Sequence, residues 1–325
     1  MIFQIFSRLI IIHGENYMMN IKILGYMIIM STYAHIELGK PLGTMVDIGD
    51  HRLHMYAMGT GIPVIFDASL GNNVLEWTLV QPEVAKFAQS ISYDRSGLGW
   101  SEKSILPRTS KNIVEELRFL LQTAQVQPPY ILVGHSSGGI TMRLFANFYP
   151  DEVFGVVLVD SSYENQRLEW ERLEKLMRPP ANTITTSVNP LAWLPEEFHI
   201  IYQQLFANPE ARATGGCEHK ELDESFNQVK HSTNNLDNKP LMVITRGTKV
   251  VDNASEERRP FEEEWHQSWL GFQKNLVALS PQGKQIIADG SGHMTQRERP
   301  DLIINAIHEM VQHYQNTLTL YDPPK

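Results

Sequence analysis

The chain has 325 residues, of which 42% are hydrophobic and 20% charged, a composition that is ordinary for a globular protein. Its formal net charge of −9 argues against a nucleic-acid surface, because phosphate binding requires clustered Lys and Arg side chains. Cys217 is the only cysteine, which excludes an intramolecular disulfide and any zinc site built on paired cysteines.

The first 45 residues differ from the rest of the chain because two short apolar runs dominate them. The runs cover residues 1–12 and 23–30, and Lys22 stands just before the second. A basic start, an apolar middle and the small-residue end 31–34 are typical of a short export signal, although each run is too short to span a bilayer. We expect an N-terminal extension over 1–45 and leave three alternatives open: export, membrane attachment, or loose packing on a cytoplasmic domain.

From Val46 onward, short apolar runs alternate with amphipathic stretches. The first two runs flank a Gly49-Asp50 turn as in a hairpin, and the unbroken run 130–133 is typical of a strand buried on both faces of a parallel sheet. Apolar residues at helical spacing predict helices over 113–124, 140–148 and 303–314. The predicted strands are residues 46–48, 54–56, 63–67, 91–94, 130–133, 156–160, 241–245 and 285–288.

This alternation predicts an α/β fold. Its eight strands form a mainly parallel sheet with helices on both faces. The core consists of 46–162 and 240–325. The stretch 163–239 interrupts the alternation, since it is helical in character and rich in aromatic residues. Because it follows the carboxyl end of a central strand, where ligands bind in open α/β sheets, we predict that it forms a helical cap or lid.

The segment Gly134-His135-Ser136-Ser137-Gly138 fits the pattern G-x-S-x-G. An apolar strand precedes it and an amphipathic helix follows it, the context expected for a serine held on a sharp strand-to-helix turn. Such a turn needs glycines, because the serine backbone is strained and its neighbours pack closely. We predict that Ser136 is a nucleophile, and that the N–H group of Ser137 stabilises a developing oxyanion at the helix N-terminus.

A serine hydroxyl needs a general base within hydrogen-bond reach. His293 follows the last predicted strand, whose carboxyl end lies at the same sheet edge as Ser136. A carboxylate should hold the imidazole and stabilise the imidazolium. Asp160 and Asp252 both follow strands and keep the order Ser, Asp, His; we favour Asp160, because the neighbours of Asp252 are typical of an exposed loop.

A second oxyanion donor is expected in the loop after the strand 63–67. The N–H group of Leu70 is the preferred candidate, and that of Ser69 is the alternative. No H-E-x-x-H pair, phosphate loop or G-x-G-x-x-G after the first strand is present, so the sequence indicates neither zincin, nucleotide-phosphate nor dinucleotide chemistry. We predict no metal site and no cofactor.

At these residues the chain resembles the α/β-hydrolase superfamily, in particular its carboxylesterase-like and lipase-like members. The resemblance runs from about Val46 to Tyr314 and implies a serine hydrolase that cleaves small or medium apolar esters through an acyl-enzyme. It also implies that Asp94 and Arg95 fix loops. Besides the serine motif it rests on residues 51–54, 68–71, 93–101, 158–160 and 290–293.

The resemblance leaves the acid and the substrate open. The family usually places its acid after the strand that Thr245 ends, which favours Asp252, whereas a lipase-like branch places it after the preceding strand, which favours Asp160. No Gly-x-x-Asp pattern follows Gly247, a departure from the usual arrangement. An amidase, a thioesterase or an acyltransferase would use the same triad, and a non-catalytic binding protein could keep the fold. An epoxide hydrolase or dehalogenase would need a carboxylate at position 136.

Overall fold

The computed structural model describes residues 39–179, 191–232 and 235–321. Contacts divide the chain into residues 1–39 and a compact unit over 40–325. The apolar runs of the predicted N-terminal extension therefore lie outside the described residues. Among the residues that are described, no helix combines the length and hydropathy needed to cross a membrane.

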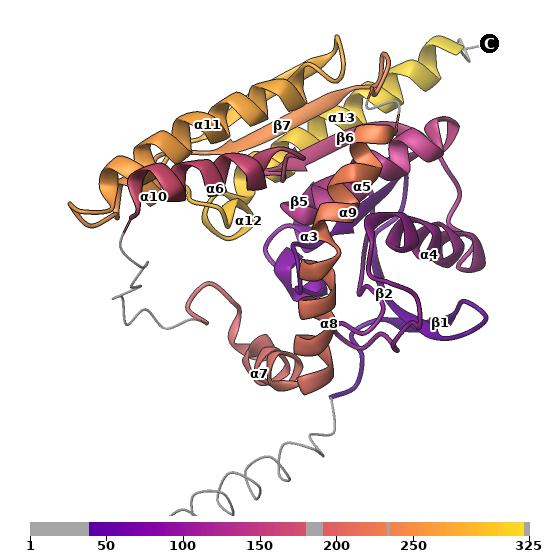
Figure 1. Ribbon diagram of the computed structural model, residues 1–325. Coiled ribbons are helices and arrows are strands. Elements are labelled where there is room, and N and C mark those ends of the chain that lie inside the picture. Colours follow the sequence, from indigo (N-terminus) through magenta and orange to yellow (C-terminus); the bar gives the residue numbers. More distant parts are fainter. Residues whose placement is uncertain (1–38, 180–190, 233–234, 322–325) are drawn as a thin grey trace, which may run out of the picture. The chain divides into compact units, whose positions relative to one another are not determined.

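An eight-stranded sheet forms the centre of the unit 40–325 (Figure 1). Its order is β1-β2-β4-β3-β5-β6-β7-β8; β1 and β2 are antiparallel to their neighbours, and the other pairs are parallel. The predicted eight-stranded, mainly parallel α/β fold is thus confirmed. The strands are β1 (Thr44–Asp47), β2 (Arg52–Met58), β3 (Pro63–Asp67), β4 (Gln89–Tyr93), β5 (Tyr130–His135), β6 (Val153–Val159), β7 (Leu241–Arg246) and β8 (Gly283–Ala288).

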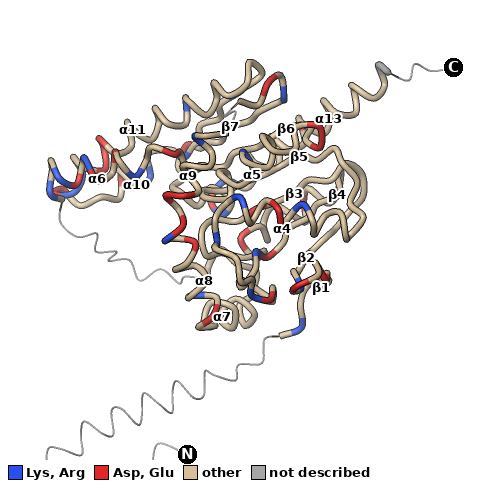
Figure 2. The backbone as a smooth tube through the Cα atoms, turned by 45° about the vertical axis from the view of Figure 1, so that its right-hand side comes forward, with Lys and Arg blue, Asp and Glu red and all other residues tan. Residues whose placement is uncertain are grey.

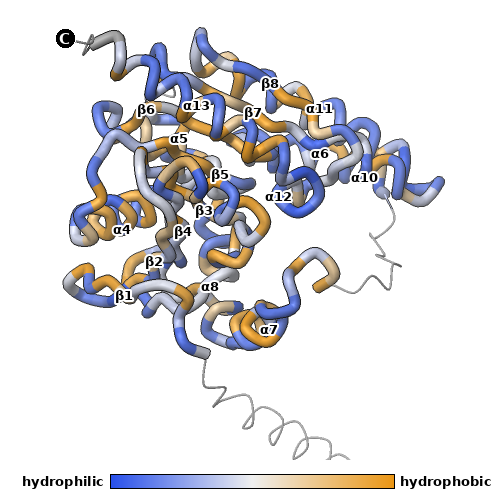
Figure 3. The backbone as a smooth tube through the Cα atoms, turned by 180° about the vertical axis from the view of Figure 1, so that it is seen from behind, coloured by the Kyte–Doolittle hydropathy of each residue, from blue (hydrophilic) through white to orange (hydrophobic). Residues whose placement is uncertain are grey.

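Helices cover both faces of the sheet, because alternate residues of each buried strand point to opposite faces. On one face, Leu132 and Val156 join a buried cluster with α4 (Ser110–Thr123) and α5 (Ser137–Phe148). On the other face, Val133 and Val157 join a cluster with α3 (Gln81–Val84) and α13 (Pro300–Tyr321). In Figure 3 the tube along β7 is largely hydrophobic, whereas that of α12 is hydrophilic.

The described residues between β6 and β7 form four α-helices and one short 3-10 helix, η3 (Glu196–Phe198). Within this insertion α9 packs against α5 and α4, while α6 packs against α11. Acidic and basic residues lie close together along α6 (Figure 2), and several of them pair. The insertion helices are α6 (Gln166–Met177), α7 (His199–Ala207), α8 (Pro209–Lys220) and α9 (Leu222–His231). The remaining helices of the described residues are η1 (Val74–Trp77), η2 (Pro150–Glu152), α10 (Lys249–Asp252), α11 (Arg259–Val277) and α12 (Thr295–Glu298).

Two strand ends differ from the prediction in a way that concerns the site. Strand β5 continues through His135, so Ser136 follows it directly at the turn into α5. Strand β6 ends at Val159 rather than at Asp160, which has a φ of 40° and lies just beyond the strand. Just beyond the strand, the carboxylate of Asp160 reaches both the end of β7, at the backbone N–H of Arg246, and the ring of His293.

Candidate active site

Ser136 occupies the sharp turn between β5 and α5. Its φ of 54° lies in the left-handed region, which is strained for a residue with a side chain. The surrounding glycines permit this turn, since a Cβ at Gly134 would lie 2.5 Å from the carbonyl oxygen of Gly138. A Cβ at Gly138 would lie 2.6 Å from the carbonyl oxygen of Asp67. Close packing on both sides thus explains the glycines of the motif.

Three side chains from the carboxyl ends of β5, β6 and β8 form a continuous hydrogen-bonded line. Nε2 of His293 lies 3.1 Å from Oγ of Ser136, and Nδ1 lies 2.6 Å from Oδ2 of Asp160. The carboxyl ends of parallel strands meet at one edge of the sheet, which brings these distant residues together. A proton can therefore pass from the hydroxyl to the imidazole while the carboxylate holds the other ring nitrogen.

Asp160 is fully buried, and both of its carboxylate oxygens are occupied. Oδ1 accepts hydrogen bonds from the backbone N–H of Arg246 (3.0 Å) and the indole N–H of Trp269 (2.7 Å). Burial by itself raises the pKa of Asp160, but the Arg246 charge and the hydrogen bond from His293 outweigh it and leave the pKa below its ordinary value. Asp160 is therefore an anion at neutral pH.

His293 has a lowered pKa, so its imidazole is neutral and able to accept a proton at neutral pH. Burial is the largest cause, and the charges of His135 and Arg246 act in the same direction, whereas Asp160 opposes them. The His293 side chain is 36% exposed, which leaves it accessible to a substrate. Its ring meets the ring of Trp269 edge-on at 6.2 Å.

His135, which precedes Ser136, forms a buried ion pair with Glu76. Its Nδ1 lies 2.7 Å from Oε1 of Glu76, and its Nε2 lies 2.8 Å from the carbonyl oxygen of His293. Burial lowers the pKa of His135, but the charge and hydrogen bond of Glu76 more than reverse this, so the net shift is upward. With a carboxylate oxygen facing Nδ1 and a carbonyl oxygen facing Nε2, the His135 ring links the segment of His293 to the turn at Ser136.

The structure places Asp252 away from the imidazole. This residue is exposed in α10, where its carboxylate accepts a hydrogen bond of 2.9 Å from the hydroxyl of Thr248. Of the two carboxylates that the sequence left open, Asp160 is the one that contacts His293. Cys217 is exposed on α8. Over the described ranges, no group of three or more His, Cys, Asp or Glu side chains could hold a metal ion.

The two predicted oxyanion donors, Leu70 and Ser137, line the same small cavity of about 20 Å³. In the described part of the chain, neither of their N–H groups has a hydrogen-bond partner. The alternative donor, the N–H of Ser69, is engaged by Oε1 of Glu76 at 3.0 Å. Leu70 and Ser137 are thus the residues whose N–H groups remain available to a substrate oxygen.

Asp94 and Arg95 hold loops in place, the role that the resemblance implied. The carboxylate of Asp94 accepts hydrogen bonds from the N–H groups of Val74 (2.8 Å) and Trp100 (3.1 Å). Other buried polar groups at the site escaped the sequence analysis. The only sequence signal for His135 was its place in the serine motif, and nothing in the sequence pointed to the three others, which are Glu76, Glu218 and Trp269.

The chain belongs to the α/β-hydrolase family, since the family model described as "alpha/beta hydrolase fold" matches residues 62–300. Among curated proteins, it is similar to the uncharacterized protein YqjL of Bacillus subtilis, with 26% identity over 251 residues that cover 77% of this chain and 84% of YqjL. The family resemblance inferred from the sequence is therefore confirmed.

Solved structures of hydrolases share this fold. A thermophilic esterase of Thermogutta terrifontis aligns with a TM-score of 0.57 and 20% identity over 85% of this chain and 99% of the esterase. An epoxide hydrolase mutant of Vigna radiata aligns with a TM-score of 0.62 and 17% identity over 83% of this chain and 98% of that chain. At such identities the likeness establishes the hydrolase fold, and the chemistry has to be argued from the site.

Proposed function

We propose that this protein is a serine hydrolase that cleaves carboxylic esters through an acyl-enzyme intermediate. Ser136 is the nucleophile, His293 the general base, and Asp160 the acid that orients the imidazole and stabilises its protonated form. The observation that carries the proposal is the unbroken line of hydrogen bonds from Ser136 through His293 to Asp160, at 3.1 and 2.6 Å.

The reaction proceeds in two halves. Ser136 Oγ bonds to the ester carbonyl carbon while His293 takes the hydroxyl proton, and the resulting oxyanion accepts hydrogen bonds from the N–H groups of Leu70 and Ser137. The carbon–oxygen bond to the alcohol then breaks, and the alcohol departs with the proton from His293. Water, deprotonated by His293, then attacks the acyl carbon. The bond between that carbon and Ser136 Oγ breaks, the acid departs, and His293 returns the proton to Oγ, which restores the hydroxyl.

Aromatic side chains of the insertion between β6 and β7 support two parts of the proposal. The first is that the substrates carry small or medium apolar groups, and the second is that the insertion forms a cap over the site. Tyr202 lies 6.0 Å from the ring of Trp193 and stacks on Phe206 at 4.2 Å. The guanidinium of Arg297 lies 3.9 Å over the ring of Trp193, and Arg297 is only four residues beyond His293. The aromatic group of the insertion therefore reaches the segment that carries the base.

Labelling with a fluorophosphonate probe tests this proposal directly. Wild-type protein should lose its ester hydrolysis as one equivalent of probe is incorporated, and the Ser136→Ala variant should incorporate none. A Ser101→Ala variant, which alters a buried serine bonded to the backbone of Asp94 and His54, serves as a control for serine removal elsewhere. Labelling of Ser136→Ala at the wild-type rate would show that the nucleophile is misassigned.

Matched substrates separate ester cleavage from the other reactions open to the same triad. A p-nitrophenyl ester, the corresponding p-nitroanilide and a thioester of the same acid should be compared by kcat/KM, with the ester turned over fastest. Epoxide hydrolysis is not proposed, even though an epoxide hydrolase shares the fold, because that chemistry needs a carboxylate where this chain has Ser136.

A further inference from the structure

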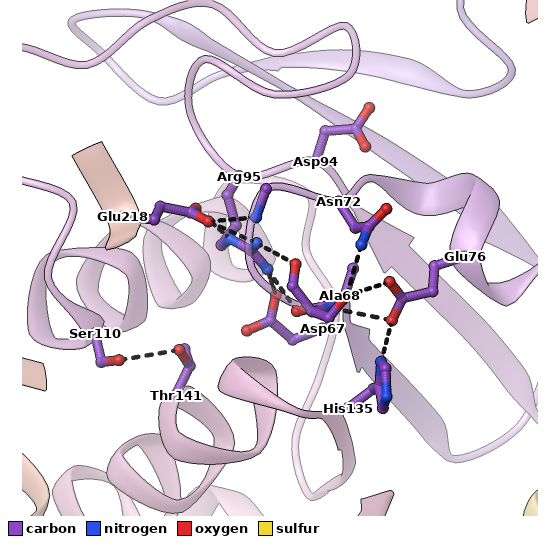
Figure 4. Close-up of polar contacts among 12 residues, drawn as sticks. Asp67, Ala68, Asn72, Glu76, Asp94, Arg95, Ser110, His135, Thr141 and Glu218 are labelled. Atoms are coloured by element: carbon purple, nitrogen blue, oxygen red, sulfur yellow. Dashed lines mark hydrogen bonds and ion pairs between the residues drawn. The ribbon is translucent and has the colours of Figure 1, made fainter. Parts of the chain in front are cut away.

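The loop between β3 and η1, which carries Leu70, is held by buried charged side chains from three separate parts of the chain (Figure 4). Arg95 donates hydrogen bonds of 2.7 Å to the carbonyl oxygens of both Ala68 and Ser69. Arg95 is itself 3% exposed, so water does not compete for these bonds. The carbonyl side of the loop is therefore fixed by one guanidinium.

The N–H side of the loop is fixed by two glutamates. Glu76 accepts the N–H of Ser69 at 3.0 Å and the Ser69 hydroxyl at 2.6 Å. Glu218 accepts the N–H of Gly71 at 2.8 Å. Between these two occupied N–H groups stands that of Leu70, for which the described residues offer no partner.

Because a peptide unit is planar, these contacts also fix the direction in which the Leu70 N–H points. The carbonyl of Ser69 and the N–H of Leu70 belong to one planar trans peptide unit and point in opposite directions. Because Arg95 holds the Ser69 carbonyl, it also sets the direction of the Leu70 N–H. The neighbouring peptide unit is held through the Gly71 N–H, so Leu70 is fixed on both sides.

Glu218 is the side chain that connects these restraints. Its carboxylate accepts a bidentate pair of hydrogen bonds from Arg95, from Nε at 2.7 Å and from Nη2 at 3.0 Å. It also accepts the N–H of Gly71. The same Nη2 holds the Ser69 carbonyl, so Glu218 sets the plane from which Arg95 acts. Glu218 is 6% exposed and belongs to α8, a helix of the insertion.

Helix α8 rests directly on this loop, and small residues make the approach feasible. A Cβ at Gly215 would lie only 3.2 Å from Cα of Gly71. On the same helix, a Cβ at Gly216 would meet no atom within 4 Å. The close approach brings Glu218 into the space beside Arg95.

We propose that Glu218 is a positioning residue: acting through Arg95 and Gly71, it aims the Leu70 N–H at the oxyanion, and α8 is a fixed wall of the site rather than part of a moving lid. This inference rests on the proposed serine-hydrolase function. Oxyanion donors act by being oriented before the charge develops, so an anchored donor stabilises the transition state without tightening substrate binding.

The first test is the isosteric variant Glu218→Gln, which removes one of the two carboxylate charges that hold Arg95. The other charge, on Asp67, accepts a hydrogen bond of 2.7 Å from Nη1 and leaves Nε and Nη2 to Glu218. Since loss of a whole oxyanion donor costs on the order of 100-fold to 1,000-fold in kcat, misaiming one should lower kcat by about 10-fold to 100-fold, with KM within about twofold. Affinity for an alkylboronic acid, which forms a tetrahedral adduct on serine, should fall by the same factor as kcat/KM. Glu210→Gln, an exposed charge change on the same helix, should leave all three quantities unchanged.

A second pair of variants keeps the test valid if Glu218→Gln folds poorly. Gly215→Ala should lower kcat several-fold by pushing α8 off the loop, whereas Gly216→Ala should not. Both exchanges improve helix propensity, so a purely structural role predicts no loss of turnover in either.

Two outcomes would overturn the inference: wild-type kcat in Glu218→Gln, or equal kcat in the two alanine variants. If the wild-type protein neither takes up the fluorophosphonate probe nor cleaves esters, the proposed function itself fails. Probe uptake by the wild type together with full turnover by the Glu218 variant would remove only the present inference.

Discussion

At the scale of single residues, the site depends on side chains whose backbone is held in unusual conformations. Ser136 and Asp160 both have positive φ, at 54° and 40°, and each directly follows a central strand. The serine motif and the glycine-rich segment before His293 made two members of the line predictable. The partners of Asp160 other than His293 were not predictable, because Trp269 contacts it across 109 positions of sequence without a motif.

The exchange Asp160→Asn should lower kcat by about four orders of magnitude while leaving the protein folded. An asparagine offers N–H groups where His293 needs an acceptor, so it favours the wrong imidazole tautomer. The expected fall in kcat is of the size seen in other serine hydrolases. Steady-state kinetics on a p-nitrophenyl ester measures the effect. Asp252→Asn, which changes an exposed carboxylate bonded to Thr248, should stay within about twofold of wild type; the reverse pattern would assign the acid to Asp252.

The pH dependence of kcat/KM should show an acid limb with its midpoint below 6.5, the ordinary pKa of histidine. Neutral His293 is the active form, and a lowered pKa keeps it neutral to lower pH, so activity is present above the midpoint and is lost as the pH falls through it. Asp160 stays ionised across this range because its pKa is also lowered. A midpoint above 6.5, measured in buffers where the protein recovers full activity on return to neutral pH, would contradict this assignment.

At the scale of elements, most of the strands and the helices α4, α5 and α13 follow from periodicity. Helix α11 is not among the elements predicted from the sequence. Its aromatic side chains do recur at helical spacing, and they form a buried cluster with Leu173 of α6. No sequence pattern indicated the contact between α8 and the loop that carries Leu70, since Glu218 and Arg95 lie 123 positions apart.

Helix α11 contributes to the site through Trp269, and the exchange Trp269→Phe should lower kcat by about tenfold. The ring packing against His293 is kept, but Oδ1 of Asp160 loses the indole hydrogen bond of 2.7 Å. Hydrogen bonds to charged groups contribute about 1.5–3 kcal/mol, and the Arg246 N–H still satisfies the same oxygen. Kinetics of Trp265→Phe, a change on the same helix without a contact to Asp160, supplies the control, and equal losses in both variants would argue against a role for the indole N–H.

At the scale of the whole molecule, the sheet brings the carboxyl ends of β5, β6 and β8 to one edge. The two buried clusters on its faces draw alternate residues from the same strands, as Leu132 and Val133 illustrate. This layout was predictable because near-continuous apolar runs identify strands buried on both faces. How the insertion packs on the rest of the unit was not predictable, because it depends on single long-range contacts rather than on a repeating pattern. Phe226 and Val229 of α9 join the buried cluster with α4 and α5, and Glu218 of α8 pairs with Arg95.

Loss of core packing should affect stability while leaving the chemistry of folded molecules intact. Leu132→Ala removes a fully buried side chain and should lower the free energy of unfolding by about 2–5 kcal/mol. Chemical denaturation measures this change, and kcat per folded molecule should remain near wild type. Phe119→Ala, at a side chain that is 48% exposed, should cost less than about 1 kcal/mol; similar costs at both positions would contradict the assigned core.

Detection of the covalent acyl-enzyme intermediate tests the proposed role of Ser136 most directly. Wild-type protein mixed with an ester, acid-quenched within one turnover and digested, should carry the acyl group on the peptide that contains Ser136, as read by tandem mass spectrometry. The Ser136→Ala variant should carry none and should turn over no ester. An acyl group mapped to another residue, or turnover at the wild-type rate without Ser136, would contradict the account.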